Sequence, residues 1–226
     1  MQWAVVLLAV AAVIIIAAGL TIASLVDRLR QLERQAMTDP LTGAFNRRHY
    51  EHCLRTAIER RTRYREPASL VVFDVDRFKD INDRFGHTSG DAVLKALVVI
   101  IRRRARSLDL VFRTGGEEFA LVLSGARLDE AIGFAEEFRA SVAASRLLNG
   151  HVVSISVGVS ELRHGQSPLE WLMEADLALY HAKEAGRNRV VGATASTGSV
   201  EIPRAFSAVA HRPATSDRRY RAAARA

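Results

Sequence analysis

The sequence predicts an α+β fold, in which a βαββαβ order of elements forms an antiparallel sheet flanked by helices and preceded by one transmembrane helix. Three observations predict it. Residues 3–26 carry no charged side chain, residues 38–192 alternate between short apolar runs and helical periodicity, and a Gly-Gly pair separates two of those runs. The 226-residue chain is long enough for one domain with extensions.

The N-terminal apolar run is predicted to be a transmembrane helix within residues 1–26. Its roughly 24 residues would extend about 36 Å, which crosses a hydrocarbon core with some tilt. Arg28, Arg30 and Arg34 follow the run and no Lys or Arg precedes it, so the positive-inside rule places the following domain in the cytoplasm. The alternative is a cleaved signal peptide, but the run is long for one and lacks a basic start.

Residues 27–37 are predicted to be a helical linker. An apolar stripe at Leu25, Leu29, Leu32 and Ala36 fits a short parallel coiled coil, or an amphipathic connector as the alternative. Residues 193–226 form a basic tail with little to bury, so we expect disorder there. Linker and tail hold much of the net charge of +7, which is therefore weak evidence for a nucleic-acid partner.

Residues 38–192 supply the elements of the predicted domain. Helices are expected at 46–63, 90–106, 128–147 and 168–185, packed on one face of the sheet. Strands are expected at 69–74, 110–113, 118–123, 151–161 and 189–192. The glycines at 115 and 116 predict a hairpin between the second and third strands.

Two groups of acidic residues adjoin these strands. Asp74 and Asp76 stand at the end of a buried apolar strand, where a carboxylate is costly without a cation or hydrogen bonds. Glu117 and Glu118 follow the Gly-Gly turn. Hard oxygen ligands near a phosphate suit Mg²⁺, which takes one or two protein carboxylates. Taken alone, a Gly-Gly turn followed by two glutamates is more often an exposed hairpin than a metal site, and an Asp at a strand end is usually a cap for the next loop.

Taken together, these motifs resemble the GGDEF family of diguanylate cyclases in its GGEEF variant. The resemblance covers about residues 38–192 and implies a palm-like sheet. It runs through DPLTGAFNRR (39–48), FDVDRFKDIND (73–83), GHTSGDAVL (86–94), RTGGEEF (113–119), SISVGVS (154–160) and AKEAGRNRV (182–190). His87 within GHTSGD is interpreted as a residue that orders the loop, because the sequence offers no clustered histidines for a metal site.

The resemblance implies a role for each matching residue. Mg²⁺, or Mn²⁺ as an alternative, would be held by Asp74, the carbonyl of Val75, Glu117 and Glu118, and Glu118 could instead help to deprotonate a 3′-hydroxyl. Asn82 and Asp91 would recognise guanine. Lys183 and Arg187 would bind the β- and γ-phosphates, assisted by the chain around Phe78 and Lys79. Without the resemblance, Lys183 and Arg187 would be interpreted as charges that compensate a helix C-terminus.

The activity that the resemblance implies is condensation of two GTP into cyclic di-GMP and two pyrophosphates. One domain holds one GTP, so a homodimer is expected, on the cytoplasmic side of a bacterial inner membrane and in contact with its lipid. Two alternatives are compatible with parts of the sequence. One is a non-catalytic receptor for GTP or cyclic di-GMP, which the retained acids disfavour. The other is a polymerase-like palm that acts on nucleic acid, a partner we do not expect because no template-gripping domain is evident.

A further motif, RSLD, places Arg106 and Asp109 three residues apart before the hairpin. It matches the RxxD inhibitory site at which many family members bind their product, and a planar guanidinium suits phosphate and guanine edges. A surface Arg–Asp pair is the alternative. The family commonly adds an arginine from the following helix, where this chain has Glu137, with Arg139 close by. Product inhibition is therefore expected, although one of the usual product-binding arginines is replaced by Glu137.

Overall fold

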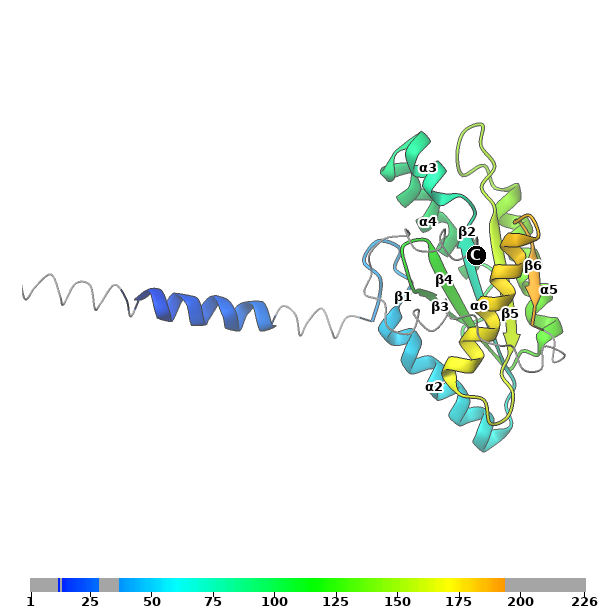
Figure 1. Ribbon diagram of the computed structural model, residues 1–226, viewed down its shortest axis with the longest axis horizontal. Coiled ribbons are helices and arrows are strands. Elements are labelled where there is room, and N and C mark those ends of the chain that lie inside the picture. Colours follow the sequence, from blue (N-terminus) through cyan, green and yellow to red (C-terminus); the bar gives the residue numbers. More distant parts are fainter. Residues whose placement is uncertain (1–11, 13, 29–36, 194–226) are drawn as a thin grey trace, which may run out of the picture. The chain divides into compact units, whose positions relative to one another are not determined.

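The computed structural model describes residues 12, 14–28 and 37–193 (Figure 1). They belong to two units, one within residues 1–37 and one that begins at Thr38. Residues 14–28 are helical. The rest of the predicted membrane segment, most of the coiled-coil stripe and the tail from 194 lie outside the described residues. Within the described part of the chain, no helix is both long and apolar enough to cross a bilayer.

The second unit is built on a six-stranded sheet in the order β1-β3-β4-β2-β5-β6. Its strands are β1 (Phe45–Asn46), β2 (Ala68–Val75), β3 (Leu110–Arg113), β4 (Glu118–Ser124), β5 (Ile155–Glu161) and β6 (Val190–Gly192). The four central strands are antiparallel, but β1 runs parallel to β3 and β6 parallel to β5. The sheet is thus mixed and not antiparallel throughout as predicted. The chain returns along helix α6 before β6, and such a crossover makes two strands parallel.

The described residues of this unit form five helices: α2 (Arg47–Tyr64), α3 (Phe78–Phe85), α4 (His87–Arg102), α5 (Leu128–Ala144) and α6 (Pro168–Glu184). Four of them pack against the sheet, whereas α3 packs against α4. Helix α3 was not predicted. Only Phe78 and Ile81 of its eight residues are buried, and two apolar positions one turn apart are a weak sign of a helix. Helix α4 begins and ends earlier than predicted, at 87–102 in place of 90–106. Strand β5 begins at 155 and not at 151, since its partner β2 ends at Val75, opposite Ile155.

The helices pack on both faces of the sheet, so the prediction of one covered face is wrong. All eight residues of β2 are buried, and alternate residues contribute to different layers. Leu70 and Val72 pack with Tyr50 of α2 and Trp171 of α6. The opposite face packs against α4 and α5, with a core that includes Val71, Phe73, Leu94, Leu97 and Phe138. Figure 1 shows α6 in front of the strands.

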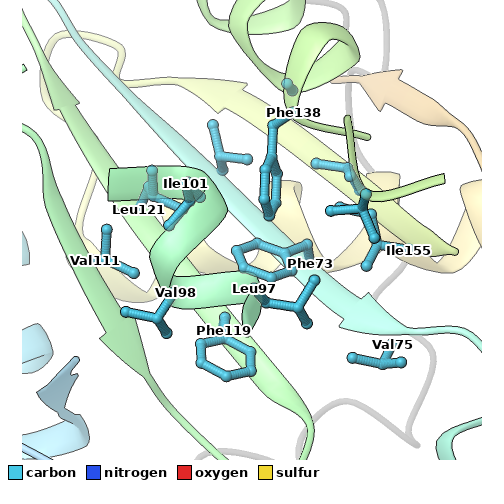
Figure 2. Packing of buried hydrophobic residues seen from close by; sticks show 14 of the residues in the cluster. Phe73, Val75, Leu97, Val98, Ile101, Val111, Phe119, Leu121, Phe138 and Ile155 are labelled. Carbon is cyan, nitrogen blue, oxygen red and sulfur yellow. The ribbon is translucent and has the colours of Figure 1, made fainter. Parts of the chain in front are cut away.

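The core layer under α4 and α5 contains an aromatic group that fixes the pairing of two central strands (Figure 2). Phe73 of β2 stacks on Phe119 of β4, with centroids 5.2 Å apart and rings 6° from parallel. The edge contact between Phe73 and Phe138 of α5 has centroids 5.0 Å apart. Phe73 and Phe119 are register partners, and the next pair in the ladder is Asp74 and Glu118. Packing of the aromatic pair therefore sets which acids lie opposite each other.

Candidate active site

Two carboxylates lie side by side where β2 ends and β4 begins. Asp74 pairs with Glu118 across the antiparallel ladder, and directly opposite residues have Cβ atoms about 4.5–5.5 Å apart. Asp74 is 7% exposed, whereas Glu118, the first residue of β4, is exposed. The carbonyl of the next residue, Val75, belongs to the buried end of the same strand. The predicted meeting of a strand-end Asp with a hairpin Glu is therefore present for Asp74 and Glu118.

Lys183, near the end of α6, forms an ion pair with this acid group. Its Nζ atom lies 2.9 Å from Oδ2 of Asp74. Burial raises the pKa of Asp74 to about 6, Lys183 opposes the rise, and the charges of Glu118 and Asp76 add to it. The carboxylate therefore lies where positive charge is needed to keep it ionised. The structure brings the predicted residues Asp74, Glu118 and Lys183 together.

The Gly-Gly turn is held by Arg113, the last residue of β3. Its guanidinium donates from Nε and Nη2 to the carbonyl of Gly116, at 3.1 and 2.7 Å, and from Nη1 to Asp39 at 3.1 Å. A Cβ atom on Gly115 would collide with the Glu118 carboxylate, so glycine leaves room for that side chain. Glu117 is half-buried at the end of the turn, one residue before β4.

Asp39 and Arg113 belong to the motifs DPLTGAFNRR and RTGGEEF, but neither motif indicates the contact between them. Burial raises the pKa of Asp39, but hydrogen bonds from Thr42 and the Arg113 guanidinium outweigh it and lower the pKa overall. The side chains of Asp39 and Arg113 are only 18% and 15% exposed. This pair could not be predicted from a local pattern, because its members are 74 residues apart in the sequence. The ion pair connects the Gly-Gly turn to the segment before β1.

The predicted guanine-binding residues lie on α3 and α4, which meet at Gly90. A Cβ atom on Gly90 would collide with Oδ1 of Asn82 and lie 3.1 Å from the Phe78 ring. The Asn82 Oδ1 atom is buried and has no hydrogen-bond partner among the described residues. Asp91 is exposed directly after Gly90. A buried acceptor without a donor is costly, so this position is suited to a ligand that supplies N–H groups.

Two predicted phosphate contacts remain apart from the acid group. Arg187 follows α6 and Lys79 lies on α3, and both side chains are exposed. Within the described part of the chain, the Arg187 guanidinium makes no hydrogen bond or ion pair. The structure thus joins only Lys183 to the carboxylates, and it leaves Arg187 and Lys79 with their charges in solvent.

Asp176 of α6 is a half-buried acid that the sequence motifs do not indicate. Burial raises its pKa to about 7, the charge of Glu118 adds to the rise, and Lys183 opposes it. The hydroxyl of Tyr50, buried and without a hydrogen-bond partner among the described residues, interacts electrostatically with Asp176. The spacing in the sequence could have indicated it: residues 176 and 183 are about two helical turns apart, so Asp176 lies on the same face of α6 as Lys183.

The carboxylates fit a divalent cation by their chemistry. The described residues include no group of three or more His, Cys, Asp or Glu side chains arranged to hold a metal ion. Mg²⁺ binds through one or two protein carboxylates and completes its shell with water and phosphate oxygens. Asp74 and Glu118 supply such oxygens, and the Lys183 ammonium already places a positive charge against Asp74.

The RSLD motif forms a turn between α4 and β3. The Asp109 carboxylate accepts a hydrogen bond from the backbone N–H of Arg106 at 2.7 Å, and the Arg106 side chain is exposed. Glu137, at the place of the common second arginine, forms an ion pair with Arg104 at 2.9 Å. The Arg139 guanidinium donates to Glu136 at 2.7 Å and to Asn188 at 2.9 Å. Both helix residues near this motif are therefore engaged within the protein.

Fold and site together define a palm-like α+β domain with an acidic group at the end of its central strands. Residues 36–189 match the family described as "Diguanylate cyclase, GGDEF domain". The match covers more than half of the chain, and the protein belongs to this family.

Curated relatives and solved structures agree with this assignment. The chain is 42% identical over 163 residues to "Diguanylate cyclase DgcM" of Escherichia coli, covering 72% of this chain and 40% of that protein. It is 40% identical over 172 residues to "Probable diguanylate cyclase DgcC" of the same organism, covering 75% and 46%. The chain thus spans less than half the length of these relatives.

Among solved structures, the coiled coil and GGDEF domain of DgcB from Caulobacter crescentus in complex with c-di-GMP has a TM-score of 0.68 at 31% identity, covering 78% of this chain and 95% of that one. The active GGEEF domain of a diguanylate cyclase from Vibrio cholerae has a TM-score of 0.64 at 36% identity, covering 66% and 97%.

Proposed function

We propose that this protein is a diguanylate cyclase, which condenses two GTP into cyclic di-GMP with release of two pyrophosphates. The observation that carries the proposal is the meeting of Asp74, Glu118 and Lys183 at one end of the sheet, with Lys183 2.9 Å from Asp74. Membership of the GGDEF family and the names of the relatives support it. The acids that a non-catalytic receptor of this family would lose are retained.

Asn82 and Asp91 select guanine in this proposal. Guanine presents donors at N1 and at its N2 amino group, whereas adenine has an acceptor at N1 and no amino group at C2. The Asn82 Oδ1 atom, which has no partner in the part of the chain that the structure describes, and the exposed Asp91 carboxylate are both acceptors. An acceptor left buried and unpaired costs about 1–3 kcal/mol. This cost favours GTP over ATP at the same position.

Asp74, the carbonyl of Val75 and Glu117 would hold Mg²⁺, or Mn²⁺ in its place, with Glu118 next to them. When bound, the cation supplies neutralisation of phosphate charge and activation of a hydroxyl. Lys183 and Arg187 bind the β- and γ-phosphates, and the chain at Phe78 and Lys79 lies along the same nucleotide. The protein thereby contributes positioning and fixed charge, the terms that dominate this kind of catalysis.

Each condensation step forms one bond and breaks one. The 3′-oxygen of one GTP bonds to the α-phosphorus of the other, the bond between the α-phosphorus and the bridging oxygen breaks, and pyrophosphate leaves. The hydroxyl proton passes to a base, for which Glu118, the exposed carboxylate at the start of β4, is the candidate. Two such steps close the ring, with one GTP supplied by each domain of a homodimer. DgcB was solved with the product bound.

We also propose a location and a control for this enzyme. The N-terminal segment anchors it in the lipid of a bacterial inner membrane, with the catalytic domain in the cytoplasm. The exposed isoleucines at 14, 15, 16 and 22 on the described helix, followed by Arg28, support this. Cyclic di-GMP binds at Arg106 and Asp109 and inhibits turnover. We expect this inhibition to be weak, because Glu137 replaces the usual second arginine and pairs with Arg104, and the guanidinium of Arg139 is already hydrogen-bonded to Asn188.

The test is turnover by the purified full chain, with GTP and ATP assayed side by side in Mg²⁺ and products identified by mass. We expect cyclic di-GMP and pyrophosphate from GTP only. Glu117→Ala should lower turnover at least about 100-fold, because a ligand of the cation is lost, while its thermal unfolding stays close to wild type.

The matched control is Glu59→Ala, which removes an exposed glutamate from α2. It should turn over GTP at the wild-type rate. A wild-type protein that binds GTP without forming product would be a receptor, and normal product from Glu117→Ala would exclude the assignment of Glu117.

A further inference from the structure

The segment after α6 adopts a backbone conformation that is unfavourable for its sequence. Gly186, Arg187 and Asn188 have consecutive positive φ angles of 110°, 64° and 45°. Glycine adopts such angles freely and asparagine tolerates them, but arginine is disfavoured there. A turn of this kind persists only where surrounding contacts hold it.

Asp76 provides a buried contact to this turn. Its Oδ2 atom accepts a hydrogen bond from the backbone N–H of Asn188 at 3.0 Å and one from the Ser154 hydroxyl at 2.7 Å. Its Oδ1 atom accepts from the Ser156 hydroxyl at 2.6 Å. Asp76 is 8% exposed, so these charge-assisted bonds are largely shielded from water. Its own N–H donates to the carbonyl of Ser154, which fixes its place after β2.

The turn is held from two further directions. The N–H of Arg187 donates to the carbonyl of Ala182 in the last turn of α6, at 3.0 Å. On the other side, Nη1 of Arg139 donates to Oδ1 of Asn188 at 2.9 Å. Arg187 therefore stands between fixed neighbours, while its guanidinium extends without a partner among the described residues. The contacts constrain the backbone and leave the charge available.

We propose that Asp76 is a positioning residue, whose carboxylate holds the Arg187–Asn188 turn so that the Arg187 guanidinium meets the terminal phosphates of GTP. This inference rests on the proposed phosphate role of Arg187. Asp76 itself touches no reacting group. The two acids at and just after the end of β2 then position both basic side chains of the phosphate site. Asp74 contacts Lys183, and Asp76 holds the turn that carries Arg187.

A purely structural role for Asp76 makes a different prediction. Loss of its hydrogen bonds would then lower the unfolding temperature and affect every ligand alike. A positioning role instead predicts an effect confined to ligands that carry the terminal phosphates, and one that disappears when Arg187 is absent. Comparing nucleotides with and without those phosphates separates the two.

The experiment measures dissociation constants of the full chain in Mg²⁺ for 3′-deoxy-GTP and for GMP. The first nucleotide lacks the attacking hydroxyl and cannot condense, and the second lacks the β- and γ-phosphates. Asp76→Ala should weaken 3′-deoxy-GTP binding about tenfold and leave GMP binding unchanged. Asp76→Asn should restore most of the affinity, because its carbonyl can accept from Asn188 and Ser154 while its amide donates to Ser156.

The double variant Asp76→Ala/Arg187→Ala supplies the decisive comparison. Its affinity for 3′-deoxy-GTP should equal that of Arg187→Ala alone, because Asp76 acts through Arg187. The control is Ser69→Ala, which removes a buried hydrogen bond to Ala126, 3.0 Å long, from the start of the same strand. It should lower the unfolding temperature and leave both dissociation constants unchanged.

The outcomes separate the inference from the function on which it rests. If Arg187→Ala weakens 3′-deoxy-GTP binding but Asp76→Ala does not, or if the two effects add, the positioning role is excluded and the phosphate role of Arg187 stands. If Arg187→Ala has no effect, both fail. An equal loss of GMP and 3′-deoxy-GTP affinity in Asp76→Ala also overturns the inference.

Discussion

Asp74 and Asp76 are two residues apart, yet their surroundings give them different tasks. The sequence predicts for both that a carboxylate at the end of a buried strand requires a cation or hydrogen bonds. Asp74 faces Lys183 and Glu118, whereas Asp76 is saturated by two hydroxyls and a backbone N–H. The sequence pattern shows that the carboxylates need partners. It cannot show which partner each one has, because the donors come from residues about 80 to 112 positions away.

The ion pair between Asp39 and Arg113 predicts a pH dependence of stability. The pKa of Asp39 is lowered below its ordinary 3.8 in the folded protein. Its contribution is therefore fully present above the unfolded pKa and is lost as the pH falls through the lower folded value. Asp39→Asn should cost about 1 kcal/mol at pH 7, or about 2–4 °C in unfolding temperature. The difference from wild type should narrow below about pH 4, as calorimetry over a pH series would show.

The control for this prediction is Glu51→Gln, which removes an exposed ion pair to Arg47. Such surface pairs contribute little to stability, so its unfolding temperature should stay near wild type at every pH. A difference between Asp39→Asn and wild type that stays constant from pH 7 to pH 3 would contradict the assigned pKa direction.

At the scale of elements, the site depends on how closely α6 lies against the sheet. Gly158 of β5 faces the backbone of α6 at Ala175 and Leu179, where a Cβ atom would overlap carbonyl and amide atoms. That close approach places Asp176 and Lys183 beside the carboxylates of the neighbouring strands. A small residue on one strand thus controls the position of a cation on a helix.

Gly158→Ala should therefore displace α6. We expect a loss of about 1–3 kcal/mol in stability from overpacking and a fall in turnover of at least about tenfold, because Lys183 moves with the helix. Thermal unfolding and initial rates with GTP measure the two effects. The control is Gly133→Ala on the exposed side of α5, where an added Cβ meets nothing within 4 Å. It should keep full activity and gain slight stability. Wild-type activity in Gly158→Ala would contradict this account of α6.

Elements were predictable where a long pattern repeats. The four long helices and the central strands follow from periodicity, and the family motifs gave the acids at the β3–β4 turn. Helix α3 was not predictable, because its two buried residues are too few to show a helical periodicity. The helices on the second face of the sheet were also not predicted, although the nearly continuous apolar run of β2 indicates a strand that is covered on both faces. Eight consecutive buried residues are typical of a strand covered on both sides, whereas an alternating strand is covered on one.

At the scale of the whole molecule, the proposed reaction needs two domains because each holds one GTP. Product formation per enzyme should therefore rise with protein concentration until the dimer is saturated. Initial rates measured over a concentration series, alongside sedimentation analysis of the same samples, test this. Binding of 3′-deoxy-GTP requires one domain and should not vary over the series. A constant specific activity at concentrations where the protein sediments as a monomer would exclude the dimeric mechanism.

By itself, the sequence determined the class of this protein. Local periodicity specifies which segments become helices and strands, and the order of its motifs along the chain identifies the GGDEF family. Only the tertiary structure decided which acid faces a lysine, which carboxylate holds the Arg187–Asn188 turn, and that the buried acceptor of Asn82 has no donor within the described ranges of the chain. The physical reason is that hydrogen bonding and burial act between atoms that packing brings together. Those neighbours come from distant parts of the chain, where no local pattern records them.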